Sequence, residues 1–383
     1  MYDTICNIDM KKFIFDRLVD RENICNLEKE RQQLTAHINN KANVVVFAPR
    51  NYGKTSLLKN IVIDDFKKRN KKSFVFFTDL LGVKDLSSII ARLIGAFEHS
   101  FTESFPVKHI MEDLKTFLSN LQPTVSIDSI TGSPSISLGI SPRNREYSIQ
   151  YVFALIQDIS KKIPTLIVID EFQDIAAIDE AQALFRTSFQ EVDNIPIILM
   201  GSKRHILHNI FSKADAPLAS WGIDIEIPPI PYAEYSEYIH ERFVSYGLKL
   251  DNELSIYLQN LLYRVPESIN IVCQQIIELF SNRELSKDDI HQALKVAIEN
   301  RERRYESALL MYSKVEETVL IQLAKSGQIE KPQSIAFLEK VSLSNRTVGK
   351  CFVRFMDLGI IEKVDAAYRI SNPLFGFYLK WYR

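Results

Sequence analysis

The feature that most constrains this chain is a loop placed between a short apolar run and a helical pattern. Residues 43–47 (NVVVF) form a continuous, β-branched run, as in a strand that is buried on both faces. Residues 55–67 show helical periodicity, and the loop between them ends in Gly53-Lys54-Thr55. The loop fits the P-loop pattern, with Ala48 at the first glycine position. A strand, loop and helix of this kind predict a parallel sheet.

Each part of such a loop has a physical task. Successive backbone N–H groups face the phosphates, and the following helix adds its positive end. Gly53 allows close approach of the backbone, Lys54 places an ammonium on the phosphate oxygens, and the Thr55 hydroxyl binds Mg²⁺. We therefore expect a site for ATP and Mg²⁺. Its nucleotide-binding residues are predicted to be Ala48, Pro49, Arg50, Asn51, Tyr52, Gly53, Lys54, Thr55 and Ser56.

A second apolar run, residues 165–169 (TLIVI), ends in two acids. Acids at the carboxyl end of a parallel strand lie beside the P-loop in such sheets. Asp170 is expected to hold Mg²⁺ through water, and Glu171 to orient and deprotonate the attacking water. Two solvated acids at a strand end are the alternative. Gln173 and Asp174 are interpreted as caps of the next helix.

A third strand, residues 196–200, is followed by Gly201-Ser202. A polar residue here would lie between the two strands of the nucleotide site. Ser202 is therefore a candidate for contact with the γ-phosphate, with an ordinary loop serine as the alternative.

The remaining pattern predicts a doubly wound α/β domain and then helices. A strand is expected at residues 73–77, and a last short strand followed by a Pro-rich turn at 223–230. Helices are expected at residues 22–40, 86–99, 150–161 and 180–193, and a β-hairpin at 124–140. Further helices are expected at residues 235–246, 252–263, 266–280 and 288–300. Three short helices and a hairpin after residue 313 have the outline of a winged helix-turn-helix. The expected domains are 1–230, 231–312 and 313–383.

The formal net charge is −1, so a nucleic-acid site would have to be a local patch. The helix predicted at residues 344–358 presents Asn345, Arg346, Lys350 and Arg354, the three basic residues at i, i+4 and i+8. From residue 343 onward there are seven basic and three acidic residues. This excess predicts contact with double-stranded DNA. Docking of a protein partner, or of a second copy, is the alternative.

The four cysteines, Cys6, Cys25, Cys273 and Cys351, are scattered and form no CxxC pair. They are expected to be reduced thiols. The first residues lack the apolar stretch of a signal peptide, and no apolar run approaches the ~18–20 residues of a membrane span. We therefore expect a cytoplasmic protein that does not enter a membrane.

These motifs together resemble the archaeal-type ATPase family, a branch of the STAND group of AAA+-related NTPases. The resemblance covers nearly the whole chain. It rests on residues 18–22 (LVDRE), 48–56 (APRNYGKTS), 169–173 (IDEFQ), 201–202 (GS), 265–266 (VP) and 368–375 (YRISNPLF). It implies that Arg21 lies near the adenine and that Pro266 belongs to a helical lid over the nucleotide.

One departure from the family concerns catalysis. Family members typically carry a Gly-Arg pair where this chain has Ser220-Trp221. The arginine is the family's candidate for stabilising transition-state charge, and an arginine finger can be worth ~10³–10⁵ in rate. Slow hydrolysis and a nucleotide-dependent switch are therefore expected, with a signalling scaffold of the STAND kind as the alternative. Lys203 and Arg204, directly after Ser202, are interpreted as solvated surface residues, with substitution for the missing arginine as the alternative.

Overall fold

The structure is a computed structural model that describes residues 11–15, 17–25, 27–105, 124–127, 134–137 and 145–383. Its contacts divide the chain into two compact units. The sheet unit consists of Leu27–Pro49 and Lys54–Pro228. The C-terminal unit consists of Pro229–Arg383, the chain before Leu27, and the loop residues Arg50–Gly53. The division into three domains at residues 230 and 312 stays a prediction.

The sheet unit is built on five parallel strands in the order β2-β5-β6-β1-β7. These strands are β1 (Val44–Phe47), β2 (Phe74–Asp79), β5 (Thr165–Asp170), β6 (Ile197–Gly201) and β7 (Ile223–Glu226). The central strands β1, β5 and β6 are almost wholly buried, which explains their continuous apolar runs. Because neighbouring parallel strands run in register, the carboxyl ends of β1, β5 and β6 meet at one edge of the sheet.

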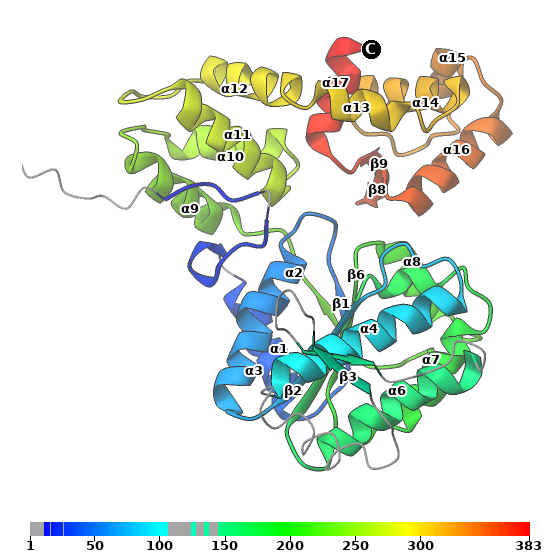
Figure 1. Cartoon of the computed structure of the whole chain (residues 1–383). Coiled ribbons are helices and arrows are strands. Elements are labelled where there is room, and N and C mark those ends of the chain that lie inside the picture. Colours follow the sequence, from blue (N-terminus) through cyan, green and yellow to red (C-terminus); the bar gives the residue numbers. More distant parts are fainter. Residues whose placement is uncertain (1–10, 16, 26, 106–123, 128–133, 138–144) are drawn as a thin grey trace, which may run out of the picture. The chain divides into compact units, whose positions relative to one another are not determined.

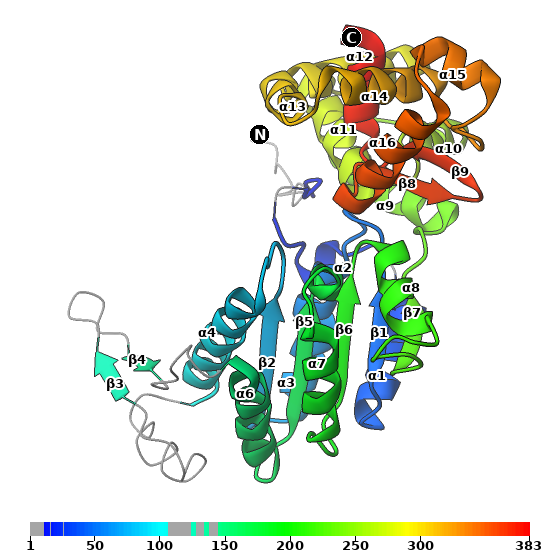
Figure 2. The ribbon, with the colours of Figure 1, turned by 90° about the vertical axis from the view of Figure 1, so that its right-hand side faces the viewer.

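Helices cover both faces of this sheet (Figures 1 and 2). On one face lie α4 (Leu86–Ser104), α6 (Arg145–Ser160) and α7 (Ala181–Gln190), with α8 (Arg204–Ser212) beside them. The other face carries α1 (Glu28–Asn39) and the helical segment after the P-loop. That segment consists of α2 (Lys54–Leu57), a π-helical stretch (Leu58–Ile63) and α3 (Asp64–Arg69). π-helical turns inside helices are frequent at functional sites.

An aromatic cluster fills the core beneath α7 and α8. Phe172 lies 5.2 Å from Phe185, and Phe189 lies 5.0 Å from Trp221, between ring centroids. Trp221 also lies 6.1 Å from Phe211 and is only 9% exposed. The residue that stands at the position of the family's arginine is therefore part of the hydrophobic core.

The C-terminal unit is mainly helical and has one continuous hydrophobic core. Its first helices are α9 (Tyr232–Val244), α10 (Asn252–Leu261), α11 (Pro266–Leu279), α12 (Lys287–Glu299) and α13 (Glu302–Leu309). They are followed by α14 (Lys314–Ser326), α15 (Ile335–Val341), α16 (Asn345–Leu358), the hairpin β8 (Ile361–Val364) and β9 (Ala367–Ile370), and α17 (Pro373–Tyr382). The order from α14 to β9 is that of a winged helix-turn-helix, with an added bridge between Ile329 and Tyr368.

The described part of the N-terminal segment is tied to the helices of this unit. Arg242 is buried and donates to the Lys12 carbonyl (3.3 Å) and to Asn23 Oδ1 (2.8 Å). Asn270 Nδ2 donates to the Ile14 carbonyl (2.8 Å). Because buried polar groups require such partners, these bonds fix the path of the segment along α9 and α11.

The structure confirms the predicted strands of the sheet, and it confirms the helices of residues 231–358 to within a few residues. The expected helix at residues 22–40 is wrong at its start, because Leu27 has a left-handed backbone (φ 67°) and α1 begins at Glu28. The helices α8, α13 and α17 were not predicted. Strands Thr124–Ile127 and Pro134–Ser137 pair in antiparallel fashion as expected, while residues 128–133 and 138–140 of that hairpin lie outside the described residues. Among the described helices, none combines the length and apolarity needed to cross a bilayer.

The burial of Trp221 predicts the outcome of placing an arginine at this position. We expect Trp221→Arg to lower the free energy of unfolding by about 3–5 kcal/mol, because it removes a large buried ring and places a charge among aromatic side chains. Trp221→Phe keeps a ring and should cost about 1–2 kcal/mol. Urea unfolding of both variants measures the difference, and a Trp221→Arg variant as stable as the parent would contradict this packing.

Candidate nucleotide site

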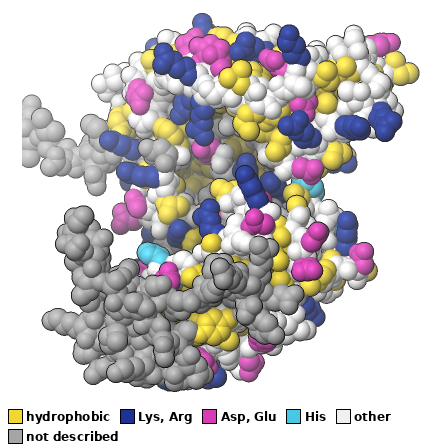
Figure 3. All heavy atoms as spheres, turned by 45° about the vertical axis from the view of Figure 1, so that its right-hand side comes forward, with side chains coloured by type: hydrophobic (Ala, Val, Ile, Leu, Met, Phe, Trp, Pro, Cys, Tyr) yellow, Lys and Arg dark blue, Asp and Glu magenta, His cyan; other side chains and the backbone are white. Residues whose placement is uncertain are grey.

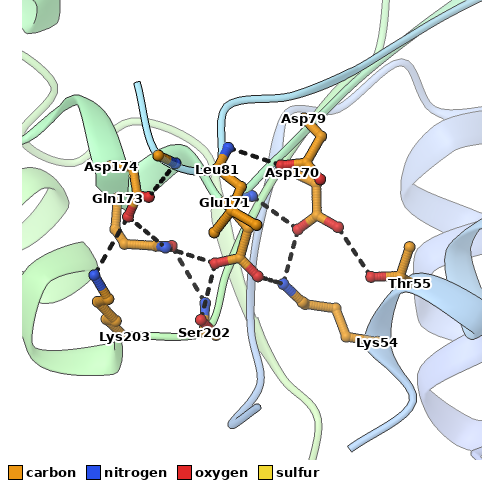
Figure 4. A network of polar contacts seen from close by, with 11 residues as sticks. Lys54, Thr55, Asp79, Leu81, Asp170, Glu171, Gln173, Asp174, Ser202 and Lys203 are labelled. Atoms are coloured by element: carbon orange, nitrogen blue, oxygen red, sulfur yellow. Dashed lines mark hydrogen bonds and ion pairs between the residues drawn. The ribbon is translucent and has the colours of Figure 1, made fainter. Parts of the chain in front are cut away.

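The centre of the site is the ammonium group of Lys54, which lies between two carboxylates (Figure 4). Its Nζ is 2.7 Å from Asp170 Oδ1 and 2.8 Å from Glu171 Oε1. Lys54 begins α2 after the loop that follows β1, and the two acids stand at the end of β5. All three side chains are at most 15% exposed, so this is a buried ion-pair cluster rather than a solvated strand end. The prediction that the acids lie beside the P-loop lysine is confirmed.

Burial and charge act in opposite directions on these groups. Burial alone would lower the pKa of Lys54, but Asp170 and Glu171 outweigh it and raise that pKa. Burial alone would raise the pKa of Glu171, but Lys54 and the hydrogen bonds from Lys54, Gln173 and Ser202 outweigh it and lower that pKa. Both groups are therefore held in their charged forms.

Thr55 completes the candidate metal position. Its Oγ1 donates to Asp170 Oδ2 over 2.9 Å, so a hydroxyl and a carboxylate oxygen converge at the start of α2 (Figure 4). Such hard oxygen donors are the ligands that Mg²⁺ prefers in proteins, and the pair fits the expected Mg²⁺ site.

The backbone at Glu171 has an unusual conformation that aims its side chain. Glu171 is left-handed (φ 49°, ψ 39°), and its N–H donates to Asp170 Oδ1 over 2.8 Å. Its Oε2 accepts from Gln173 Nε2 (2.6 Å) and from Ser202 Oγ (2.8 Å). Non-glycine residues in this region cost about 1 kcal/mol or more and are often found at functional sites. Ser202, at the end of β6, is thus part of the site's hydrogen-bond network.

The backbone conformation of the P-loop explains which residue types it contains. Asn51 (φ 66°) and Gly53 (φ 76°) are left-handed, a conformation that asparagine and glycine adopt most readily. Ala48 is buried, remains outside the left-handed region, and its N–H donates to the Gly201 carbonyl (3.4 Å). An alanine in place of the first glycine is therefore compatible with this backbone.

The other predicted nucleotide-binding residues are distributed over both units. Ala48, Pro49, Lys54, Thr55 and Ser56 belong to the sheet unit. Arg50, Asn51, Tyr52 and Gly53 belong to the C-terminal unit by their contacts, as do Arg21, in the 3-10 turn Arg21–Asn23, and Pro266, the first residue of α11. Their nucleotide-binding roles stay predictions.

The interpretation of Gln173 and Asp174 as caps is wrong. Both lie in the 3-10 turn Phe172–Ile175, whereas α7 begins at Ala181. Gln173 instead donates to Glu171, and Asp174 Oδ2 accepts the N–H of Gly82 (2.8 Å). Their position directly after the two acids is the feature of the sequence that indicates this role, because a buried carboxylate needs further hydrogen-bond donors.

The two basic residues after Ser202 differ from one another. The sequence predicts a solvated Lys203, which is wrong, because its side chain is only 16% exposed and its Nζ lies 3.4 Å from Asp174 Oδ1 (Figure 4). Arg204 is a surface residue as predicted, and it pairs with Glu226 (2.7 Å).

The predicted DNA-contacting residues lie on α16, in the C-terminal unit. Asn345, Arg346, Lys350 and Arg354 are all exposed, which confirms that the three basic residues lie on the solvent side of the helix. The guanidinium of Arg354 is paired with Glu316 of α14.

The sequence matches no family model and no curated protein. The fold is similar to that of the Walker-type ATPase PABY2304 of Pyrococcus abyssi, with a TM-score of 0.64 at 16% identity, over 96% of this chain and 99% of that one.

Two proteins of Aeropyrum pernix are also similar in structure. The ORC2 protein, solved in ADPNP and ADP complexes, gives a TM-score of 0.54 at 14% identity and covers 95% of this chain and 94% of its own. The ORC1 protein, solved in complex with DNA, gives 0.52 at 12% identity over 96% and 94%. At such identities the likeness concerns the fold alone. This chain has the α/β fold of AAA+-related P-loop ATPases, as its sequence predicts.

Proposed function

We propose that this protein binds ATP with Mg²⁺, hydrolyses it slowly and acts as a nucleotide-dependent switch. The observation that carries the proposal is the cluster of Lys54, Thr55, Asp170 and Glu171 where the P-loop helix meets the end of β5. These groups supply a cation for phosphates, oxygen ligands for a metal and a carboxylate for a water. The cluster lies at the carboxyl ends of parallel strands, where such sheets bind their ligands.

Each residue of the cluster has a part in the proposed reaction. When ATP binds, Lys54 exchanges its carboxylate partners for phosphate oxygens. Thr55 and Asp170 would hold Mg²⁺, which would supply positive charge to neutralise the phosphates. Glu171, freed from Lys54 on Oε1, accepts a proton from the attacking water. Ser202 donates to Oε2 of the same carboxylate. Contact of this serine with the γ-phosphate would therefore change the hydrogen bonding of Glu171.

The expected slow rate is supported by Trp221. The position at which the resembling family carries an arginine is filled by a ring of the hydrophobic core, so this residue supplies no cation for transition-state charge. A slow hydrolytic step suits a switch, because the lifetime of the ATP-bound state is then long.

We further propose that the winged helix binds double-stranded DNA through α16. Exposed Arg346 and Lys350 would contact phosphates, and the DNA complex of the A. pernix ORC1 protein is the precedent on this fold. The excess of positive charge is modest. On the face drawn in Figure 3, Lys and Arg side chains are interspersed with Asp and Glu side chains over the described residues. Arg354 is paired with Glu316 and would have to exchange that partner.

Docking of a protein is the second candidate for the same module, as in a STAND-type scaffold. It is favoured by apolar side chains on the winged helix that point to solvent, Val353 of α16 (62% exposed) and Ile335 of α15 (75% exposed). Apolar side chains at such positions suit a protein surface better than a phosphate backbone. Hydrolysis that does not respond to duplex DNA would favour this candidate.

The first prediction from the proposed function concerns hydrolysis. Glu171→Gln should lower the ATP hydrolysis rate by about 10²–10⁴-fold, the range for loss of a general base, while ATP binding is kept. Glu191→Gln, an exposed glutamate at the end of α7, is the matched control and should keep the parent rate. Steady-state phosphate release with and without duplex DNA measures both variants. Equal rates for Glu171→Gln and the parent would contradict the assigned role.

The second prediction concerns the ion-pair cluster. Lys54→Met leaves two buried carboxylates without their cation and should destabilise the protein by about 3–5 kcal/mol, with loss of ATP binding. Added Mg²⁺ should recover part of that stability. Lys68→Met removes an exposed pair with Asp64 and should change stability by less than about 0.5 kcal/mol. Thermal unfolding with and without MgCl₂ measures both, and equal losses would show that burial of the Lys54 pair is unimportant.

The third prediction concerns DNA. Lys350→Ala should weaken binding to duplexes of any sequence and reduce the slope of log affinity against log salt by about 1, because one phosphate contact is lost. Arg303→Ala, an exposed arginine on α13, is the control of equal charge and should leave the slope unchanged. Fluorescence anisotropy over a salt series gives both values. An unchanged slope for Lys350→Ala would remove α16 from the DNA interface.

A further inference from the structure

The side chain of Gln173 is buried in the centre of the hydrogen-bond network around Glu171 (Figure 4). Gln173 is only 1% exposed, and it lies in the turn directly after β5. Its Nε2 donates to Glu171 Oε2 (2.6 Å) and to Asp174 Oδ1 (3.1 Å), and its Oε1 accepts the backbone N–H of Ser202 (3.2 Å). Both amide protons and the carbonyl thus have partners, so this side chain is fully used.

The chemistry of these partners fixes the orientation of the amide. The NH₂ group faces two carboxylates, which only accept hydrogen bonds, and the carbonyl faces a backbone N–H, which only donates. A rotated amide would place an oxygen against both carboxylates. The side chain therefore has a single arrangement in which every group is satisfied.

Two neighbours hold Gln173 in place. Gly201, the last residue of β6, leaves room for the amide, because a Cβ at that position would lie 2.0 Å from Gln173 Oε1. Asp174 is itself held, since Oδ2 accepts the Gly82 N–H and Oδ1 lies 3.4 Å from Lys203 Nζ. The amide is thus fixed from the ends of two adjacent strands and from the loop after β2.

We propose that Gln173 is a positioning residue that holds the Glu171 carboxylate for attack by water. This inference rests on the proposed function, in which Glu171 activates the water. Of the two carboxylate oxygens, Oε1 is bound to Lys54, which leaves for phosphate when ATP binds. Oε2 is bound to Gln173, whose amide is also held by Asp174 and by the backbone N–H of Ser202. Gln173 therefore keeps Oε2 fixed while Oε1 is freed for the water.

The arrangement also explains why a glutamine suits this position. A glutamate of nearly the same shape would set a third carboxylate against Glu171 and Asp174, and each would lose the donor that Gln173 supplies. A methionine would fill similar volume without any hydrogen bond. These two substitutions separate an added charge from a lost donor.

The experiment compares Gln173→Glu and Gln173→Met with the parent. Single-turnover hydrolysis of radiolabelled ATP gives the rate of the chemical step, and titration with a fluorescent ATP analogue gives the affinity. We expect the rate to fall about 100-fold in both variants, because a displacement of about 1 Å in a reacting group can cost this much. The affinity should stay within about 3-fold, since Gln173 acts through Glu171 and not through the phosphates. Gln33→Glu, an exposed glutamine of α1, is the matched control and should change neither value.

A second variant tests the same contact from the other side. Gly201→Ala should displace the Gln173 amide and lower the rate in the same way, again with little change in affinity. Thermal unfolding of each variant identifies any that is not folded, and such a variant is excluded from the comparison of rates.

The outcomes separate this inference from the function on which it rests. A clear parent rate that Gln173→Met leaves unchanged would overturn the positioning role alone. A loss of affinity as large as the loss of rate would also overturn it, because Gln173 would then serve nucleotide binding. A parent rate no higher than that of Glu171→Gln would overturn the proposed hydrolysis, and this inference with it.

Discussion

The ion-pair cluster of Lys54 with Asp170 and Glu171 is the interaction on which the rest of the site depends. Two neighbouring carboxylates cannot both be buried and charged at the edge of a sheet unless a cation lies between them. The lysine that supplies the charge is 116 residues away in sequence, and parallel pairing of β1, β5 and β6 brings it there. In the proposed function the same ammonium would bind the phosphates once nucleotide is present, in exchange for these carboxylates.

A polar network surrounds this cluster, and its members are hydrogen-bonded. Glu171 adopts a left-handed backbone, Gln173 fills the space left by Gly201, and Ser202 closes the network from β6. Four buried side-chain nitrogen or oxygen atoms lack a partner in the described residues, and none belongs to these groups. In a low-dielectric interior a satisfied network is rigid, and an unsatisfied one is costly. This rigidity is what a carboxylate needs if it is to hold one water in position.

The C-terminal unit follows a different principle, because its parts share one apolar core. Tyr305 of α13 packs against Phe375 and Tyr378 of α17, so the helices of residues 231–312 and the winged helix are joined by aromatic contacts. An ion pair also joins the two strands of the hairpin, where Arg369 Nη2 lies 2.7 Å from Glu362 Oε1.

The sequence by itself determined the parallel sheet, the P-loop, the two acids at the end of β5 and the winged-helix outline. Each of these depends on a local pattern, such as the apolar run of β1, which the structure confirms. The start of α1 and the partners of Gln173, Lys203 and Trp221 were decided by the tertiary structure alone. Gln173 finds the backbone of Ser202 29 residues away, and Trp221 is a core residue only because Phe189 and Phe211 pack on it. A side chain's partners at such separations are set by how strands and helices pack, and periodicity along the chain carries no information about them.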